Sequence, residues 1–211
     1  MEVEWLPTGA KKIEYLESTG TQYIDMLYNA STTFCHVEGR FSFTSFTKSG
    51  VGQDVNFIIP FGAFNNCCPI DLYIPVTDNT STSIGIEVGT TYSTSISGGT
   101  ISLNTPFSFD LKAESNNLYG NCNGMTFNGT SYSGNLSTNS MRLFASHHIS
   151  SGVYAYAKIK CYYFKCYSSA GNLVRDFNPV RVGEVGYLYD KVSKTLFGNE
   201  GSGSFTLGPD K

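Results

Sequence analysis

The most constraining feature of this 211-residue sequence is a long stretch near its C-terminal end in which apolar and polar side chains alternate. In the segment 153–167, mostly apolar residues occupy one parity, while Lys158, Lys160 and Tyr162 occupy the other. Alternation with a period of two is typical of a β-strand that buries one side and exposes the other. Phe164 arrives out of parity, which predicts a β-bulge near the end of the strand. We therefore expect a sheet with one covered face here.

Similar strands recur along the chain, and residues that favour helices are sparse. The segments 35–44 and 107–114 alternate in the same way, and His36 in the first of them is expected to face outward. Asn123-Gly124 lies between two short strand-like runs, as a tight hairpin turn would. Aromatic residues make up 14% of the chain and glycine occurs 22 times, a composition typical of short strands joined by turns. The fold class that follows is all-β.

Both ends of the chain carry segments that resemble a known family. The N-terminal segment is Ile13–Asp25 (IEYLESTGTQYID), and the C-terminal segments are 169–179 (SAGNLVRDFNP), 185–192 (VGYLYDKV) and 196–208 (LFGNEGSGSFTLG). They resemble the concanavalin A-like, or laminin-G-like, domains that recur in phage structural proteins and in surface proteins of gut bacteria. The resemblance implies an antiparallel β-sandwich of two sheets, a concanavalin A-like jelly roll. We expect one such domain over residues 10–211, preceded by an N-terminal arm over residues 1–9. Because sandwiches of this kind host many functions, the fold alone does not select one.

The charge and the cysteine content limit the partners and the compartment. The formal net charge of −3 and the pI near 5.6 give no basic footprint for nucleic acid or for an anionic membrane. No apolar run is long enough for a leader peptide or a membrane span, so we expect synthesis in a cytoplasm. In that compartment the six cysteines are expected to be free thiols. The adjacent pair Cys67-Cys68 is the exception most open to oxidation.

No pattern in the sequence indicates catalysis or metal binding. Glucanase relatives of this fold carry both catalytic carboxylates on one strand in a Glu-x-Asp-x-x-Glu pattern, which this sequence does not contain. His36, His147 and His148 would form a metal site only if the loop after Phe144 lay over the strand of His36. Adjacent side chains of an extended chain point in opposite directions, so at most one of His147 and His148 reaches a shared ion without a special turn. Laminin-G relatives sometimes hold calcium through loop aspartates, but the candidates here lack a tight oxygen-rich run. These candidates are Asp54, Asp71 and Asp78. We expect no enzyme activity, no metal and no cofactor.

The outward side of the 153–167 strand is a candidate binding surface. It would place Tyr154, Tyr156 and Tyr162 in a row beside Lys158 and Lys160. Aromatic rings flanked by polar groups suit stacking on sugar rings or anchoring of a protein partner. In the alternative arrangement, these tyrosines lie under a loop or in the core between the two sheets. The sequence leaves both arrangements open.

Two functions of different classes follow from these observations. In the first, the protein is a non-catalytic structural component of a phage particle, such as a capsid decoration, head fibre or tail-associated protein. It would be assembled in the bacterial host cytoplasm and would contact other virion proteins or copies of itself, with host-surface glycan binding as an added role. In the second, it is a carbohydrate-binding adhesion module at the surface of a gut bacterium. A chain that starts at its own methionine and contains no linker favours the first function.

The N-terminal arm offers a further contact. Trp5 and Leu6 are apolar and stand ahead of the first family-like segment. We expect this arm to dock on a partner subunit. Neither nucleic acid binding nor membrane insertion is expected.

Overall fold

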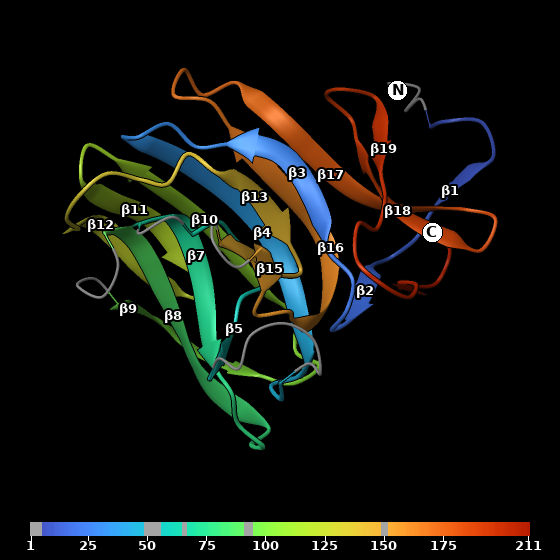
Figure 1. The fold of residues 1–211 in the computed structure, drawn as a ribbon, viewed down its shortest axis with the longest axis horizontal. Coiled ribbons are helices and arrows are strands. Elements are labelled where there is room, and N and C mark those ends of the chain that lie inside the picture. Colours follow the sequence, from blue (N-terminus) through green and yellow to red (C-terminus); the bar gives the residue numbers. More distant parts are fainter. Residues whose placement is uncertain (1–5, 49–55, 65–66, 91–94, 149–151) are drawn as a thin grey trace.

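Antiparallel β-strands build the described part of the chain. The computed structural model describes residues 6–48, 56–64, 67–90, 95–148 and 152–211, and no helix occurs within these ranges. None of these segments could therefore cross a membrane as a helix. Figure 1 shows the strands in two layers, with several smaller sheets in front of one large sheet. The prediction of an all-β antiparallel sandwich is confirmed.

The large sheet contains eleven strands. In chain order they are β1 (Ala10–Lys12), β2 (Leu16–Thr19), β4 (Phe34–Ser45), β10 (Phe107–Glu114), β11 (Asn117–Cys122), β12 (Met125–Ser131), β16 (Lys158–Tyr167), β17 (Leu173–Val182), β18 (Val185–Asp190), β19 (Thr195–Phe197) and β20 (Thr206–Leu207). The main path is β12-β11-β10-β4-β16-β17-β18-β19, while β1 pairs with β17 and β2 pairs with both β16 and β20. The predicted hairpin turn at Asn123-Gly124 is confirmed, with φ of 47° and 85° at its two residues.

The second layer consists of shorter sheets. Its strands are β3 (Ile24–Asn29), β5 (Phe57–Ile58), β6 (Phe61–Gly62), β7 (Cys67–Pro75), β8 (Ser81–Thr90), β9 (Ser95–Ser102) and β13 (Ser140–Leu143). One sheet has the order β5-β7-β8-β9 and another the order β3-β13-β6. The remaining strands, β14 (Ser146–His148) and β15 (Gly152–Tyr154), pair only with each other. Figure 1 shows β3, β7, β8 and β13 on the near side of β4 and β16.

Aromatic side chains fill the space between the two layers. The ring of Phe61 on β6 lies 5.0 Å, between centroids, from the rings of Phe109 on β10 and Phe164 on β16. It also lies 6.0 Å from the ring of Phe41 on β4. All four side chains are fully buried, and burying a large apolar side chain contributes about 1.5–3 kcal/mol. Gly39 on β4 leaves room for them, because a Cβ atom there would lie 2.5 Å from the ring of Phe109.

The two family-like end segments lie against each other. Strand β2 runs between β16 and β20, so Leu16 is opposite Cys161 on one side and Leu207 on the other. The buried side chain of Gln22 donates a hydrogen bond of 3.1 Å to the carbonyl of Ser202. Residues from both termini therefore close the same end of the large sheet.

The single strand predicted over 153–167 is interrupted. Strand β15 ends at Tyr154, and β16 begins at Lys158 in a different sheet. Between them Ala155 has a φ of 54°, in the left-handed region that residues other than glycine rarely adopt. The predicted β-bulge is confirmed, because the register between β16 and β4 shifts just after Cys161.

We predict that Phe61→Ala lowers the free energy of unfolding by about 3–5 kcal/mol, because the ring leaves a cavity between the layers that close packing cannot fill. Urea denaturation measures the effect. Met125→Ala is the control, since Met125 is an exposed large apolar residue and its loss is expected to cost no more than about 0.5 kcal/mol. Equal losses for the two variants would contradict this account of the core.

Candidate functional site

Of the two arrangements open for the tyrosines, the exposed row does not hold for Tyr154 and Tyr156. Tyr154 is 6% exposed and packs in a small cluster with Ile59 and Ala155. Tyr156 is 7% exposed, and its ring meets that of Tyr23 edge to face at a centroid distance of 6.3 Å. Burial raises the pKa of both phenols. The left-handed turn at Ala155 is the physical reason, because its carbonyl accepts a hydrogen bond from Ile59 and turns the chain away from the line of β16. For these two tyrosines the covered arrangement is the correct one.

Lys158, which was also a candidate for the binding surface, instead contacts the segment that follows β4. The Nζ atom of Lys158 donates to Thr47 Oγ1 at 3.0 Å and to the carbonyl of Lys48 at 3.2 Å, so it anchors the segment after β4.

In the N-terminal arm, Trp5 lies outside the described residues, and Leu6 is partly buried. Docking of the arm on a partner stays a prediction.

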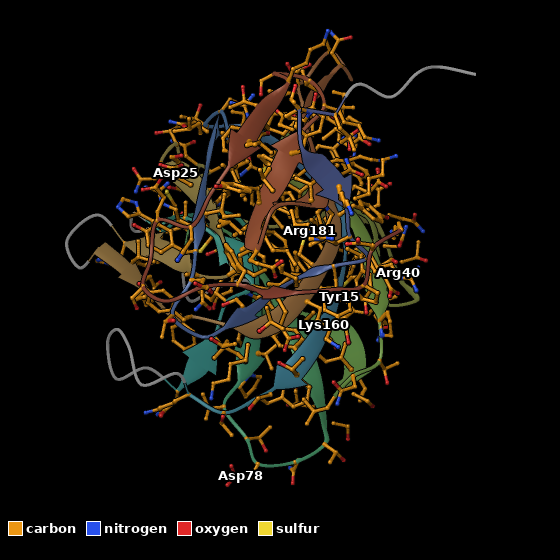
Figure 2. The ribbon with its side chains drawn as sticks, turned by 90° about the vertical axis from the view of Figure 1, so that its right-hand side faces the viewer. Tyr15, Asp25, Arg40, Asp78, Lys160 and Arg181 are labelled. Atoms are coloured by element: carbon orange, nitrogen blue, oxygen red, sulfur yellow. The ribbon has the colours of Figure 1, made fainter. Side chains whose placement is uncertain are left out.

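Two rings and two cations form an array on the outer side of the large sheet. We call this array, which consists of Tyr15, Arg40, Lys160 and Tyr162, the aromatic–cation face. Lys160 Nζ lies 4.4 Å from the ring centroid of Tyr15, and Arg40 Cζ lies 5.4 Å from that of Tyr162. The two rings meet edge to face at 5.8 Å. Figure 2 shows Tyr15, Lys160 and Arg40 on the same side of the molecule, with Asp25 on the other side.

The pairing of distant strands assembles this face. Arg40 comes from β4, Lys160 and Tyr162 come from β16, and Tyr15 directly precedes β2. Ile159 and Cys161 are buried in the core, so the alternate residues of β16 point outward. Alternation in the sequence indicates the outward position of Lys160 and Tyr162. It does not indicate Tyr15, because Tyr15 joins the array only through the pairing of β2 with β16.

The aromatic–cation face carries charges of both signs. Glu17 is the cross-strand partner of Lys160 on the pairing of β2 with β16. Partial burial raises the pKa of Tyr162, and the nearby carboxylate of Glu14 adds to this rise, whereas Lys160 and Arg40 oppose it. Each cation–π contact contributes about 0.5–1 kcal/mol at a partly exposed site. The face is therefore an ordered surface of mixed charge, unlike a basic patch for a polyanion.

A second polar cluster lies further along β4 and β16 and includes one residue of the neighbouring strand β10. The ring of His36 stacks on that of Tyr167 at 4.4 Å, and His36 Nε2 lies 2.8 Å from Asp110 Oδ1. The predicted outward orientation of His36 is therefore confirmed. The Tyr167 hydroxyl donates to Glu38 at 2.6 Å, and Lys165 donates to the same carboxylate at 3.2 Å. Partial burial alone would raise the pKa of Glu38, but these hydrogen bonds outweigh it and lower the pKa. The polar groups of this cluster thus form hydrogen bonds and ion pairs with one another.

A pair of carboxyl groups, one buried and one half-buried, lies on the other layer. Asp71 on β7 is the cross-strand partner of Glu87 on β8, and its side chain is 0% exposed. Burial raises the pKa of Asp71, and the nearby Glu87 raises it further. Cys68 Sγ donates to Glu87 Oε2 at 3.8 Å. A fully buried carboxyl group cannot touch a substrate, so the pair does not form a glycosidase centre.

The metal candidates from the sequence do not come together. Asp71 is buried, Asp78 lies in the exposed loop before β8, and Asp54 lies outside the described residues. Within the described ranges, no group of three or more His, Cys, Asp or Glu side chains is placed to hold a metal ion. The six cysteines all lie within the described ranges, and none of them forms a disulfide there.

A cleft that the sequence did not indicate opens where the two chain ends meet. We call it the end cleft, and its volume is about 340 Å³. Its walls come from the start of β3 and β13 on one side and from β19 and the residues after it on the other. The lining residues are Tyr23, Asp25, Leu27, Arg142, Thr195, Leu196, Phe197, Gly198 and Glu200. No local pattern could have revealed it, because its walls are far apart in the sequence.

We predict that Asp71→Asn raises the free energy of unfolding at pH 7 by more than about 1 kcal/mol. The folded-state pKa of Asp71 is raised, so the aspartate costs stability as the pH rises above the ordinary pKa of about 3.9 that it has in the unfolded chain. The amide keeps the oxygen that accepts from the Ala63 N–H and carries no charge.

Denaturation curves recorded from pH 4 to pH 8 check this prediction. The gain in the free energy of unfolding should shrink toward pH 4, where Asp71 also binds a proton in the unfolded chain. Asp78→Asn in the exposed loop should change little at any pH. A loss of stability for Asp71→Asn that is equal across the whole range would contradict the prediction.

Comparisons with known proteins leave the chain without an assigned family. No family model matches the sequence. No curated protein matches it either. Among solved structures, the chain is similar to the native heptameric SAP-like pentraxin from Limulus polyphemus, with 10% sequence identity, a TM-score of 0.48 and coverage of 75% of each chain. A likeness at this level does not by itself establish shared ancestry or function, so the description of the chain as a β-sandwich rests on its own sheets.

Proposed function

We propose that the protein is a non-catalytic structural component of a phage particle that acts through protein–protein contacts. Components of this kind are capsid decoration proteins, head fibres and tail-associated proteins. The particle setting is supported by the resemblance of both end segments to domains that recur in phage structural proteins. The contact surface is the aromatic–cation face on the outer side of the large sheet.

The observation that carries the proposal is the ordered pairing of rings and cations on that face. Lys160 lies over Tyr15, and Arg40 lies over Tyr162, at 4.4 and 5.4 Å from the ring centroids. Tyrosine and arginine are enriched at the centres of protein interfaces, where a few such side chains carry most of the binding free energy. Side chains that are already held in place lose less conformational entropy on binding.

The charges of the face also fit a protein partner. Glu17 stands opposite Lys160, and Glu14 lies near Tyr162, so cations and anions are interleaved. Such a surface gives specificity through complementary charges on the partner. The alternative function, a carbohydrate-binding adhesion module of a gut-bacterial surface protein, would use the same rings for stacking on sugars.

We predict that Arg40→Gln and Tyr162→Ala each lower incorporation of the protein into particles at least tenfold. Truncation of an interface anchor costs about 2 kcal/mol or more, and about 1.4 kcal/mol corresponds to a factor of ten. Each variant is supplied in place of the original chain during particle assembly. Mass spectrometry of the purified particles then measures the number of copies of the protein per particle.

Tyr119→Ala is the matched control. Lys112 Nζ lies 5.2 Å from the ring centroid of Tyr119, but Lys112 is also bound to Glu114 at 3.0 Å. Incorporation of this variant should equal that of the original chain. Absence of the original chain from particles, together with saturable glycan-array binding that Tyr162→Ala abolishes, would replace the structural role by the adhesion role.

A further inference from the structure

The end cleft is separate from the aromatic–cation face. Asp25, which lines the cleft, lies on the other side of the molecule from Tyr15 and Arg40 (Figure 2). A ligand of the end cleft would therefore leave the aromatic–cation face free. What the cleft can bind follows from its rigidity, its charges and its apolar surface.

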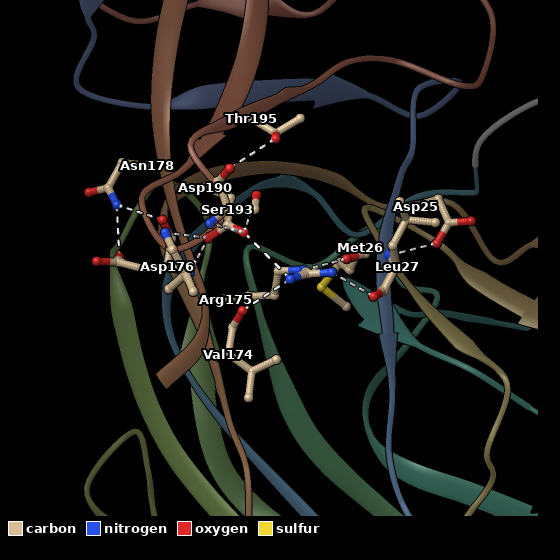
Figure 3. Close-up of polar contacts among 11 residues, drawn as sticks. Asp25, Met26, Leu27, Val174, Arg175, Asp176, Asn178, Asp190, Ser193 and Thr195 are labelled. Carbon is tan, nitrogen blue, oxygen red and sulfur yellow. Dashed lines mark hydrogen bonds and ion pairs between the residues drawn. The ribbon is translucent and has the colours of Figure 1, made fainter. Parts of the chain in front are cut away.

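Both walls of the end cleft are held in place by one guanidinium group. Arg175 on β17 donates to the carbonyls of Met26 and Leu27 on β3, at 3.0 and 2.8 Å. The same group lies 3.6 Å from the buried carboxylate of Asp190, which in turn accepts from Ser193 in the turn before β19 (Figure 3). The cleft is therefore formed before a ligand arrives, which reduces the free energy that binding must spend on ordering.

The polar groups of the cleft favour a neutral ligand with hydroxyl groups. Arg142 forms an ion pair of 2.7 Å with Asp25, so its charge is already balanced. Glu200 is exposed and forms no ion pair with any described residue. Two carboxylates and one arginine leave a formal charge of −1 on the lining, which disfavours anionic ligands. Ionised carboxylates accept strong hydrogen bonds from hydroxyl groups.

An apolar rim accompanies these acceptors. Leu27 is 63% exposed, although its φ of 47° lies in the left-handed region. Its N–H donates to Asp25 at 2.9 Å, and its carbonyl accepts from Arg175, so hydrogen bonds on both sides fix the unusual conformation. Strained residues that their surroundings over-determine cluster at ligand sites. The ring of Phe197 lines the same cleft.

We propose that the end cleft binds a single neutral pyranose ring. The apolar C–H face of the sugar lies against Phe197 and Leu27. Its hydroxyl groups donate to Glu200 and to Oδ2 of Asp25, because Oδ1 of Asp25 already accepts from Leu27 and Ser140 and pairs with Arg142. The volume of about 340 Å³ falls near the lower limit of small-molecule sites, which suits one sugar ring and excludes an extended oligosaccharide from the cleft itself. The balanced charge of Arg142 excludes recognition of a phosphate or a sulfate. This site goes beyond the proposed structural function and does not depend on it.

The test uses the full chain and a panel of methyl pyranosides of glucose, galactose, mannose and N-acetylglucosamine, followed by saturation-transfer NMR and calorimetry. At least one member is expected to bind saturably, and methyl glucuronide is expected to bind no better than the neutral sugars. Glu200→Gln should weaken the best ligand at least tenfold, because an amide is a poorer acceptor than a carboxylate. Failure of every neutral sugar to bind would overturn the proposal.

Two further variants separate binding from folding. Leu27→Gly removes the apolar rim but relieves the left-handed strain, so it should weaken binding while leaving thermal stability unchanged or higher. Met125→Ala, at an exposed residue outside both surfaces, should leave sugar binding unchanged. Binding that survives both Glu200→Gln and Leu27→Gly, or that Met125→Ala abolishes, would place the sugar elsewhere and refute the end cleft as its site. Neither result depends on whether the protein is found in particles.

Discussion

The arrangement of the two chain ends depends on a buried charge, the guanidinium of Arg175 beside the carboxylate of Asp190. Arg175 on β17 donates to the carbonyls of Met26 and Leu27 and lies 3.6 Å from Asp190, so this one group fixes where β17 and β18 stand relative to β3. Two carbonyls of β3 would otherwise be open at the edge of a small sheet, where a foreign strand could add. Arg175 occupies them, and in doing so it joins the front layer to the large sheet.

The two candidate surfaces both arise from this closure of the ends. Tyr15 reaches the aromatic–cation face because β2 pairs with β16. Tyr23 reaches the end cleft because its carbonyl accepts a hydrogen bond from the N–H of Glu200. A short stretch near the N-terminus therefore contributes a ring to each side of the molecule. The interior behind both surfaces is a packed aromatic core. The residues that stabilise the fold are therefore different from the residues that we propose to bind partners.

Local patterns in the sequence predicted much of the fold and little of the site. Period-two alternation identified the outward face of β16, and the parity break at Phe164 located its bulge. The interruption at Ala155 could not be predicted, because alanine in the left-handed region has no sequence signal, and its consequence is that Tyr154 and Tyr156 are buried. The end cleft joins residues near positions 25, 142 and 200, and only tertiary structure brings such positions together.

The position of β2 between β16 and β20 has a consequence for synthesis of the chain. Its hydrogen-bonding partners on β16 and β20 are made long after it, and contacts such as that of Thr21 with Ser202 span 181 positions. Contacts of such long range make folding slow, since loop-closure entropy must be overcome before they contribute. While a ribosome still covers the C-terminal segment, the N-terminal strand has no completed sheet to enter. Until the residues around Ser202 have left the ribosome, the edges of this strand stay open to pairing with other chains.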